Sequence, residues 1–195
     1  MTVGPSYVYI ALARTASLSV TRWLVDHHGG EILTPLYHSA EVPAEHQGKL
    51  VFSVVRHSYD RVVSLGELMR QKFWPNEQWM AQAQKAGRGQ KALTLWEFVQ
   101  WCANTEELPR YQQYRLSQSA VLQEGRALVG DIRIVRFENL AEGLNALPFV
   151  SKPFGPPYHL NSVRRGLLRN QLTANVRLAI QEYCACDFKE FGYQL

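Results

Sequence analysis

The chain has 195 residues, of which 46% are hydrophobic, and this predicts one globular domain over residues 1–195. No apolar run approaches the ~18 residues of a membrane span, so none is expected. The net charge of +4 combines fifteen Arg and six Lys with 17 acidic residues. The arginines are scattered and no nucleic-acid-binding motif is present, so nucleic acid is not an expected partner. An excess of arginine over lysine favours recognition of phosphate or sulfate.

The three cysteines are expected to be thiols in a reducing compartment. Cys184 and Cys186 lie two positions apart on an expected helix, a poor geometry for a disulfide. No histidine joins them at the spacing of zinc ligands, and no metal site is expected. The first residues lack the basic start of a secretion signal, so a cytoplasmic protein is predicted.

The first predicted strand covers residues 7–12 (YVYIAL), a run of aromatic and β-branched residues expected at the centre of the sheet. A loop of small and hydroxyl residues follows at 13–19, and then an amphipathic helix. This order directs backbone N–H groups toward an anion. The loop has neither the glycines nor the Gly-Lys-Ser/Thr ending of a Walker A motif. Small residues that only cap the helix are the alternative interpretation.

The next predicted elements are a helix end at Gly29-Gly30, a short second strand at 31–33 and a helical turn at 42–45. His38 lies in the connection between the last two. Since it follows the second strand, we expect it at the edge of the sheet that carries the first loop.

Residues 50–55 (LVFSVV) form a near-continuous apolar run, typical of a buried parallel strand. Arg56 follows, and from Tyr59 the apolar residues recur with a helical period. Arg56 is therefore expected at the carboxyl end of a strand, where open α/β sheets bind ligands. With Ser64 on the helix it would form an oxyanion pocket, because a guanidinium binds phosphate with two parallel hydrogen bonds. An arginine that caps the helix or pairs with a carboxylate is the alternative.

The rest of the chain predicts further helices and one more strand, with no second domain. Residues 73–92 are expected to be a mobile excursion at the mouth of the site. A capping box at 94–97 predicts a helix through Cys102. The remaining predicted elements are helices at 111–123, from 138 and at 173–188, a strand at 131–137, and an irregular Pro-rich segment at 149–161.

Several of these segments together resemble sulfotransferases that use 3′-phosphoadenosine-5′-phosphosulfate, nearest to the carbohydrate and small bacterial branch. Residues 12–19 resemble the family's 5′-phosphosulfate loop, Pro-Lys-Thr-Ala-Gly-Thr-Ser. Residues 56–64 (RHSYDRVVS) resemble its 3′-phosphate motif, Arg-Asn-Pro-Tyr-Asp-Arg-Leu-Val-Ser, including the Arg-to-Ser spacing. Residues 136–140 (RFENL) and 187–193 (DFKEFGY) resemble a later strand-to-helix junction and the family's common ending.

The resemblance implies a three-layer α/β/α fold with a central parallel sheet, like that of P-loop proteins. It also implies the donor 3′-phosphoadenosine-5′-phosphosulfate, without a metal. The residues expected to bind the donor are Arg14, Thr15, Ala16, Ser17, Leu18, Ser19, Arg56, Ser64 and Arg165. Arg14 is also expected to be catalytic, since its positive charge would stabilise the charge that develops during transfer. Asn161, Arg164 and Arg165 would close over the donor, or form a solvated basic loop.

The loop departs from the family pattern at four positions. Ala13 replaces Pro, Arg14 replaces Lys, Ser17 replaces Gly, and Leu18 replaces a hydroxyl residue. In the second motif, residues 57–58 (HS) replace Asn-Pro. Arg14 keeps the charge, whereas Leu18 removes one hydroxyl contact.

The acceptor hydroxyl needs a general base, and His38 is the first candidate because the family often has a histidine at this edge. His159, Glu67 and Glu77 are the alternatives. His27 and His28 fall at a helix end, and His57 lies within the phosphate motif.

The sequence thus predicts an enzyme that transfers the sulfuryl group to the hydroxyl of a carbohydrate or small alcohol. The alternatives are a non-catalytic nucleotide-binding protein of the same fold and a kinase-like phosphotransferase. Four tryptophans could stack on an acceptor ring or belong to helix cores: Trp74, Trp79, Trp96 and Trp101.

Overall fold

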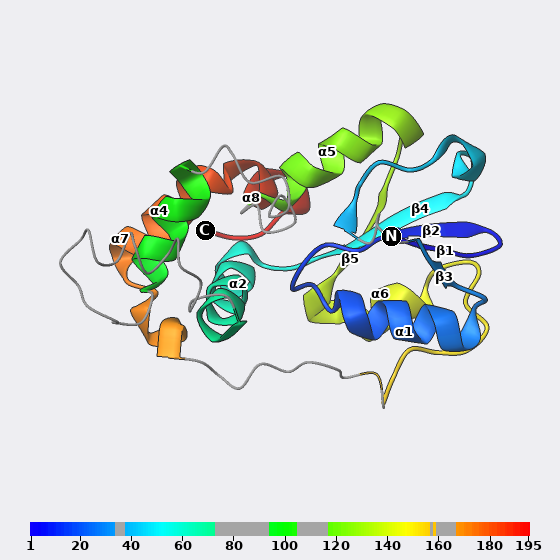
Figure 1. Cartoon of the computed structure of the whole chain (residues 1–195), viewed down its shortest axis with the longest axis horizontal. Coiled ribbons are helices and arrows are strands. Elements are labelled where there is room, and N and C mark those ends of the chain that lie inside the picture. The colour runs from blue at the N-terminus through cyan, green and yellow to red at the C-terminus, as the bar shows by residue number, and fades with distance from the viewer. Residues whose placement is uncertain (34–37, 73–93, 105–116, 157, 159–166) are drawn as a thin grey trace.

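A computed structural model describes residues 1–33, 38–72, 94–104, 117–156, 158 and 167–195. Its centre is a mixed five-stranded sheet with the strand order β3-β1-β2-β4-β5 (Figure 1). The strands are β1 (Thr2–Val3), β2 (Tyr7–Ile10), β3 (Glu31–Ile32), β4 (Leu50–Val55) and β5 (Arg133–Arg136). The chain is therefore an α/β protein, as predicted.

The parallel part of the sheet is β2, β4 and β5, in the positions predicted from their apolar runs. Tyr7 pairs with Leu50, and Phe52 pairs with Arg133, in parallel register. Strand β2 lies third of five, which confirms its central place. Strands β2 and β4 are almost wholly buried, which explains why their sequences show no polar alternation.

The expected central parallel sheet is a mixed sheet, with a parallel part and an antiparallel part. The predicted second strand, β3, pairs with β1 and not with β2, and β1 runs antiparallel to both neighbours. Strand β1 was not predicted, because two residues are too short for a periodic pattern. It pairs with β2 through a tight reversal between Val3 and Tyr7, where the Gly4 N–H donates to the Tyr7 carbonyl at 3.0 Å.

Helices cover both faces of the sheet (Figure 1). On one face α1 (Ser17–His27) and α6 (Leu140–Asn145) pack with the aromatic residues of β2 and β4. On the other face α5 (Gln118–Val129) contributes Val121 and Leu122 to a cluster with Val8 and Ile10. The sheet and its helices thus form three layers.

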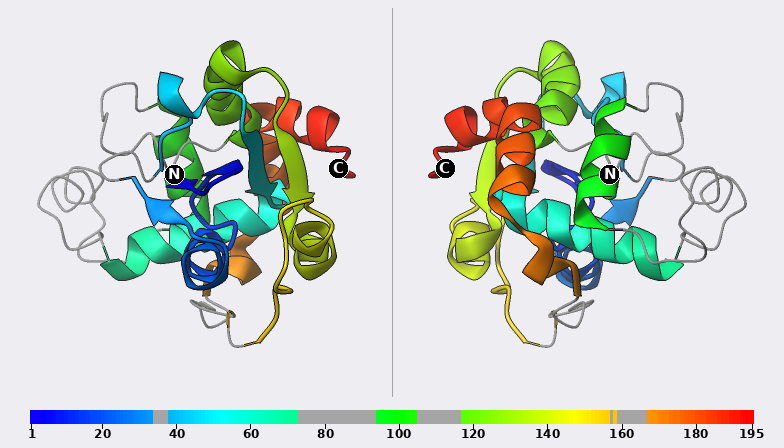
Figure 2. Two further views of the ribbon diagram at one scale, coloured as in Figure 1. Left: turned by 90° about the vertical axis from the view of Figure 1, so that its right-hand side faces the viewer. Right: turned by 90° about the vertical axis from the view of Figure 1, so that its left-hand side faces the viewer.

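A second helical cluster lies beyond the carboxyl ends of β2 and β4, on the left of Figure 1 and facing the viewer on the right of Figure 2. It consists of α2 (Ser58–Lys72), α4 (Leu95–Asn104), α7 (Ala174–Tyr183) and α8 (Ala185–Phe191), with the short helical turn η5 (Leu167–Gln171). Their apolar stripes meet in one core, and Cys184 is buried in it.

The long helix expected at 173–188 is two helices. The backbone of Cys184, with φ −111° and ψ 20°, ends α7 and begins α8. This break lets Asp187 and Phe188 turn inward, and both are buried.

The helix expected at 111–123 begins, among the described residues, at Gln118 and runs to Val129; residues 111–116 lie outside the described part. The capping box before α4 is confirmed: the Glu97 N–H donates to Thr94 Oγ1 at 3.2 Å, and the Thr94 N–H to Glu97 Oε2 at 2.9 Å. The turns η2 (Ala44–His46) and η4 (Phe137–Asn139) complete the helical elements named here. No helix in the described ranges has the length and apolar character needed to cross a membrane.

Candidate functional site

The turn from β2 into α1 has a strained backbone at two residues. Arg14 has φ 67° and Ala16 has φ 63°, in the left-handed region that L-residues rarely adopt. Such a residue is less stable by roughly 1–2 kcal/mol than one in the right-handed region, and such strain is concentrated at functional sites. Thr15 lies buried between them and donates its hydroxyl to the Leu12 carbonyl at 2.9 Å, which supports the turn from inside.

This backbone geometry suits an anion. Ala16 is left-handed (φ 63°, ψ 21°), and Ser17 begins a right-handed helix. Successive N–H groups in such a pair of residues converge on one point and form an anion-binding concavity. Ala16 occupies the N-cap position of α1 and has no side-chain oxygen to offer the first N–H groups of the helix. Leu18, 46% exposed, points away from the core.

The turn from β4 into α2 presents Arg56. Its guanidinium lies over the ring of Phe137, with the carbon Cζ 4.5 Å from the ring centre. Burial lowers the pKa of Arg56, while the carboxylates of Asp60 and Glu138 act against this shift. An arginine remains charged under any such shift, so a half-buried cation faces the first turn.

The two turns are in contact, although 42 to 50 residues separate them. Arg14 Nε donates to Ser64 Oγ at 2.9 Å, and Arg56 Nη1 approaches the Arg14 carbonyl at 3.4 Å. The structure therefore brings together three of the predicted site residues. Ser64 Oγ accepts the bond from Arg14, and a serine hydroxyl can donate its own hydrogen as well.

His38 lies at the same edge of the sheet. Its Nδ1 is 2.6 Å from the carbonyl oxygen of Ala11, one residue after β2. A carbonyl can only accept, so Nδ1 carries the proton and the neutral ring has its basic lone pair on Nε2. Burial lowers the pKa of His38, and the bond to Ala11 opposes this while the nearby Arg61 charge adds to it. At neutral pH the imidazole is mainly neutral, the form a general base requires.

Arg61 is a second buried cation below the first turn. It is 1% exposed, and its Nε donates to the Ala13 carbonyl at 3.0 Å. Burial lowers its pKa, and the Asp187 carboxylate opposes the shift. Its guanidinium places positive potential beneath the loop. The sequence did not predict this role. Arg61 does fall on the buried face of an amphipathic helix, and a charged residue at such a position indicates a buried, bonded cation.

The backbone of Arg56 is held by Gln118, another residue that the sequence did not indicate. Its Oε1 accepts from the Arg56 N–H at 2.9 Å, and its Nε2 donates to the Arg56 carbonyl at 2.8 Å. The carboxylate of Asp187 binds Gln118 in turn. One signal existed for Asp187, because it falls within the apolar stripe formed by Ile180, Cys184, Phe188 and Phe191.

Among the other candidate bases, Glu67 is buried and already engaged. Its Oε1 accepts from the Leu168 N–H at 2.7 Å, and its Oε2 pairs with Arg70 Nε at 3.1 Å. The bond to Leu168 joins α2 to η5, and the pair with Arg70 lies within α2, so Glu67 has a structural role. The candidates Glu77 and His159 lie outside the described residues, as do Asn161, Arg164, Arg165, Trp74, Trp79 and the excursion at 73–92. Trp96 is exposed, and Trp101 packs against the helical core.

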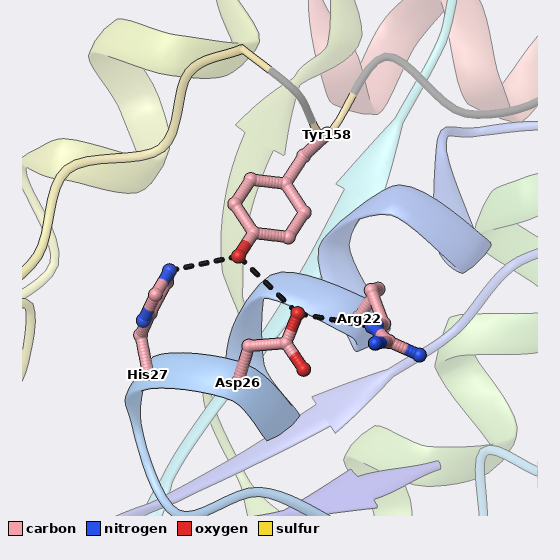
Figure 3. Close-up of polar contacts among 4 residues, drawn as sticks. All are labelled: Arg22, Asp26, His27 and Tyr158. Atoms are coloured by element: carbon pink, nitrogen blue, oxygen red, sulfur yellow. Dashed lines mark hydrogen bonds and ion pairs between the residues drawn. The ribbon is translucent and has the colours of Figure 1, made fainter.

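His27 and His28 lie at the far end of α1 from the turn. Figure 3 shows the hydroxyl of Tyr158 between His27 and Asp26, with Oη 2.7 Å from His27 Nε2 and 3.3 Å from Asp26 Oδ2. Asp26 also pairs with Arg22 at 2.9 Å. The ring of His28 bonds the Lys152 carbonyl at 3.2 Å. The two histidines thus bind Lys152 and Tyr158, away from the two turns.

In the part of the chain that the structure describes, no three His, Cys, Asp or Glu side chains gather in a way that could hold a metal ion. Comparisons with models of protein families, with curated proteins and with solved structures found no match.

Proposed function

We propose that the chain is a sulfotransferase that moves the sulfuryl group of 3′-phosphoadenosine-5′-phosphosulfate to a hydroxyl acceptor, a carbohydrate or a small alcohol, on a P-loop-like sulfotransferase fold. One observation carries the proposal. Two strand-to-helix turns at the ends of adjacent parallel strands meet through the Arg14–Ser64 bond, with Arg56 beside them. The carboxyl edge of a parallel sheet is where α/β proteins bind phosphorylated ligands.

The residues of the site fit a donor with two separate anionic groups. Arg56 and the Ser64 hydroxyl would bind the 3′-phosphate. The left-handed turn at Arg14 and Ala16, with the N–H groups that open α1, would bind the 5′-phosphosulfate. The proposal includes a cytoplasmic location for the chain.

The donor supplies an activated sulfuryl group, and the chain supplies position, positive potential and a base. In the proposed mechanism His38 Nε2 takes the proton of the acceptor hydroxyl as the acceptor oxygen forms its bond to sulfur. The bond from sulfur to the phosphate oxygen breaks, and its electron pair remains on adenosine 3′,5′-bisphosphate. Arg14 and the backbone N–H groups from Thr15 to Ser19 stabilise the negative charge that develops there.

The test is transfer of labelled sulfate from the donor to a panel of sugars, alcohols and phenols, together with magnesium-free titration of adenosine 3′,5′-bisphosphate. The proposal predicts both binding and transfer. Binding without transfer to any acceptor would support the non-catalytic alternative, for which the exposed Leu18 in place of a hydroxyl residue is the relevant observation. Magnesium-dependent binding of ATP alone would support the kinase-like alternative.

A further inference from the structure

The C-terminal segment Asp187–Tyr193 has no part in the proposed chemistry, yet it contains the most heavily bonded carboxylate of the described residues. Asp187 is 0% exposed. Its Oδ1 accepts from the Ser117 hydroxyl and from the N–H and hydroxyl of Ser119, at 2.8–2.9 Å. Its Oδ2 accepts from the Ser58 hydroxyl and from the N–H and side-chain amide of Gln118, at 2.9–3.3 Å. A buried carboxylate with this number of donors fixes whatever carries them.

The donors belong to two places that bear on the anion site. Ser117, Gln118 and Ser119 open α5, so Asp187 caps that helix from another part of the chain. Ser58 opens α2, immediately after Arg56 and His57. Asp187 therefore ties the beginning of α5 to the beginning of α2.

Gln118 connects Asp187 to Arg56 through hydrogen bonds. Its amide Nε2 faces two acceptors, the Arg56 carbonyl at 2.8 Å and Asp187 Oδ2 at 3.2 Å. Two acceptors on one side set the orientation of the amide, which leaves Oε1 to accept the Arg56 N–H at 2.9 Å. Both polar backbone groups of Arg56 are thus held by one side chain, and Asp187 sets how that side chain points.

A second route reaches the next residue. The Tyr193 hydroxyl donates to Glu138 Oε2 at 2.8 Å, and Glu138 Oε1 accepts from the His57 N–H at 2.9 Å. The ring of Tyr193 also lies against the His57 ring, with 5.0 Å between centres. Burial, followed by the bond to Glu138, raises the pKa of Tyr193, so the hydroxyl stays protonated and able to donate.

We infer that Asp187 and Tyr193 are positioning residues for the Arg56 site: through Gln118 and Glu138 the C-terminal segment holds the backbone of 56–58 in the conformation that presents Arg56 to a 3′-phosphate. The inference rests on the proposed function for the identity of the anion. By linkage, an anion that requires this conformation also stabilises α8 against local unfolding.

The experiment compares Gln118→Ala with Gln123→Ala, and Tyr193→Phe with Tyr183→Phe. Gln123 lies on the same helix as Gln118, but is exposed and bonds Glu190, and Tyr183 is exposed on α7. In each pair the site variant and its control therefore remove the same side-chain atoms. Calorimetric titration with adenosine 3′,5′-bisphosphate and adenosine 5′-phosphate gives the selectivity for the 3′-phosphate. If these residues act only on stability, the ratio of the affinities for the two nucleotides stays as in the wild type.

Gln118→Ala should lower the affinity for adenosine 3′,5′-bisphosphate about tenfold, and Tyr193→Phe about threefold. The affinity of these variants for adenosine 5′-phosphate, and both affinities of the control variants, should stay nearly unchanged. Equal losses for both nucleotides, or wild-type affinity in both site variants, would overturn the inference. If Gln118→Ala does not fold, Tyr193→Phe carries the test alone.

A protein that does not bind adenosine 3′,5′-bisphosphate at all would refute the proposed function and leave the positioning role open to a separate measurement. Hydrogen exchange of the His57 amide should be faster in Tyr193→Phe than in Tyr183→Phe, because the acceptor Glu138 loses its support. Equal exchange in the two variants would overturn the role.

Discussion

The turn after β2 and the turn after β4 lie side by side at one edge of the sheet, and they keep their shapes by different means. In the first, Arg14 and Ala16 are left-handed, Thr15 binds the carbonyl of Leu12, and the distant Arg61 and Arg56 bind the carbonyls of Ala13 and Arg14. In the second, distant side chains bind N–H groups: Gln118 binds that of Arg56, and Glu138 binds that of His57.

This difference suggests a division of labour. A strained turn is preorganised for charge that develops only during reaction, and strain of this kind is typical of reactive sites. A turn whose N–H groups are already bound by side chains suits a stable contact made by the Arg56 side chain. Changes at the first turn and its neighbour His38 should therefore lower turnover, and changes at the second should lower nucleotide affinity.

The largest effect is expected for His38→Ala. Loss of the proposed base should lower kcat by ~10²- to 10⁴-fold, the range for a positioned proton acceptor, while adenosine 3′,5′-bisphosphate binding stays close to wild type. Steady-state kinetics and calorimetry measure the two quantities. His46→Ala, at a half-buried histidine in η2, is the control. A His38→Ala enzyme with most of its turnover would remove His38 from the mechanism.

Arg14→Ala should lower kcat by ~10²-fold, the usual loss for one transition-state donor, with a smaller change in donor affinity. Arg14→Lys should recover much of the rate, because it restores the charge. If Arg14→Ala raised only the KM of the donor, Arg14 would be an anchor like Arg56, and the division between the turns would fail.

The pH profile should show the depressed pKa of His38. Burial favours the neutral ring, so the acidic limb of kcat/KM, which reports the free enzyme, should lie below the ordinary histidine value of about 6.5. Activity is present above this pKa and lost as the pH falls through it. Bound phosphate and sulfate groups favour the imidazolium, so the limb of kcat should lie at higher pH than that of kcat/KM. Persistence of the limb in His38→Ala would assign it to another group.

The smallest effect is expected for Ala16→Gly. Glycine adopts the left-handed conformation of residue 16 without strain, so the free energy of unfolding should rise by about 0.5–1 kcal/mol. Ala141→Gly, at an exposed position of α6, should have the opposite sign. Urea unfolding of both variants decides the matter, and a destabilised Ala16→Gly would show that the turn is not strained.

The sequence predicts the strands that precede both turns, but not the bonds that brace the second turn. The apolar runs of β2 and β4 and the capping box at Thr94 are local patterns, and the structure confirms them. The bonds of Gln118 to Arg56 and to Asp187 join residues 62 and 69 positions apart, so no local pattern indicates them.

The lack of a local pattern also explains the two main errors in predicting the fold. Strand β1 has two residues and is stabilised by its neighbours β2 and β3 rather than by its own propensity. The break at Cys184 follows from packing, since apolar residues continue with helical spacing across it.

The central claim is that Arg56 binds the 3′-phosphate of the donor nucleotide, and a calorimetric comparison tests it most directly. Adenosine 3′,5′-bisphosphate and adenosine 5′-phosphate are titrated into the wild-type protein, Arg56→Ala and the control Arg22→Ala, whose exposed arginine pairs with Asp26. We predict that the wild type binds the bisphosphate more tightly than adenosine 5′-phosphate. Arg56→Ala should weaken binding of the bisphosphate by ~2 kcal/mol or more, because a charge-assisted contact is lost, and should change binding of adenosine 5′-phosphate little. Equal losses for the two nucleotides, or no preference in the wild type, would contradict the account.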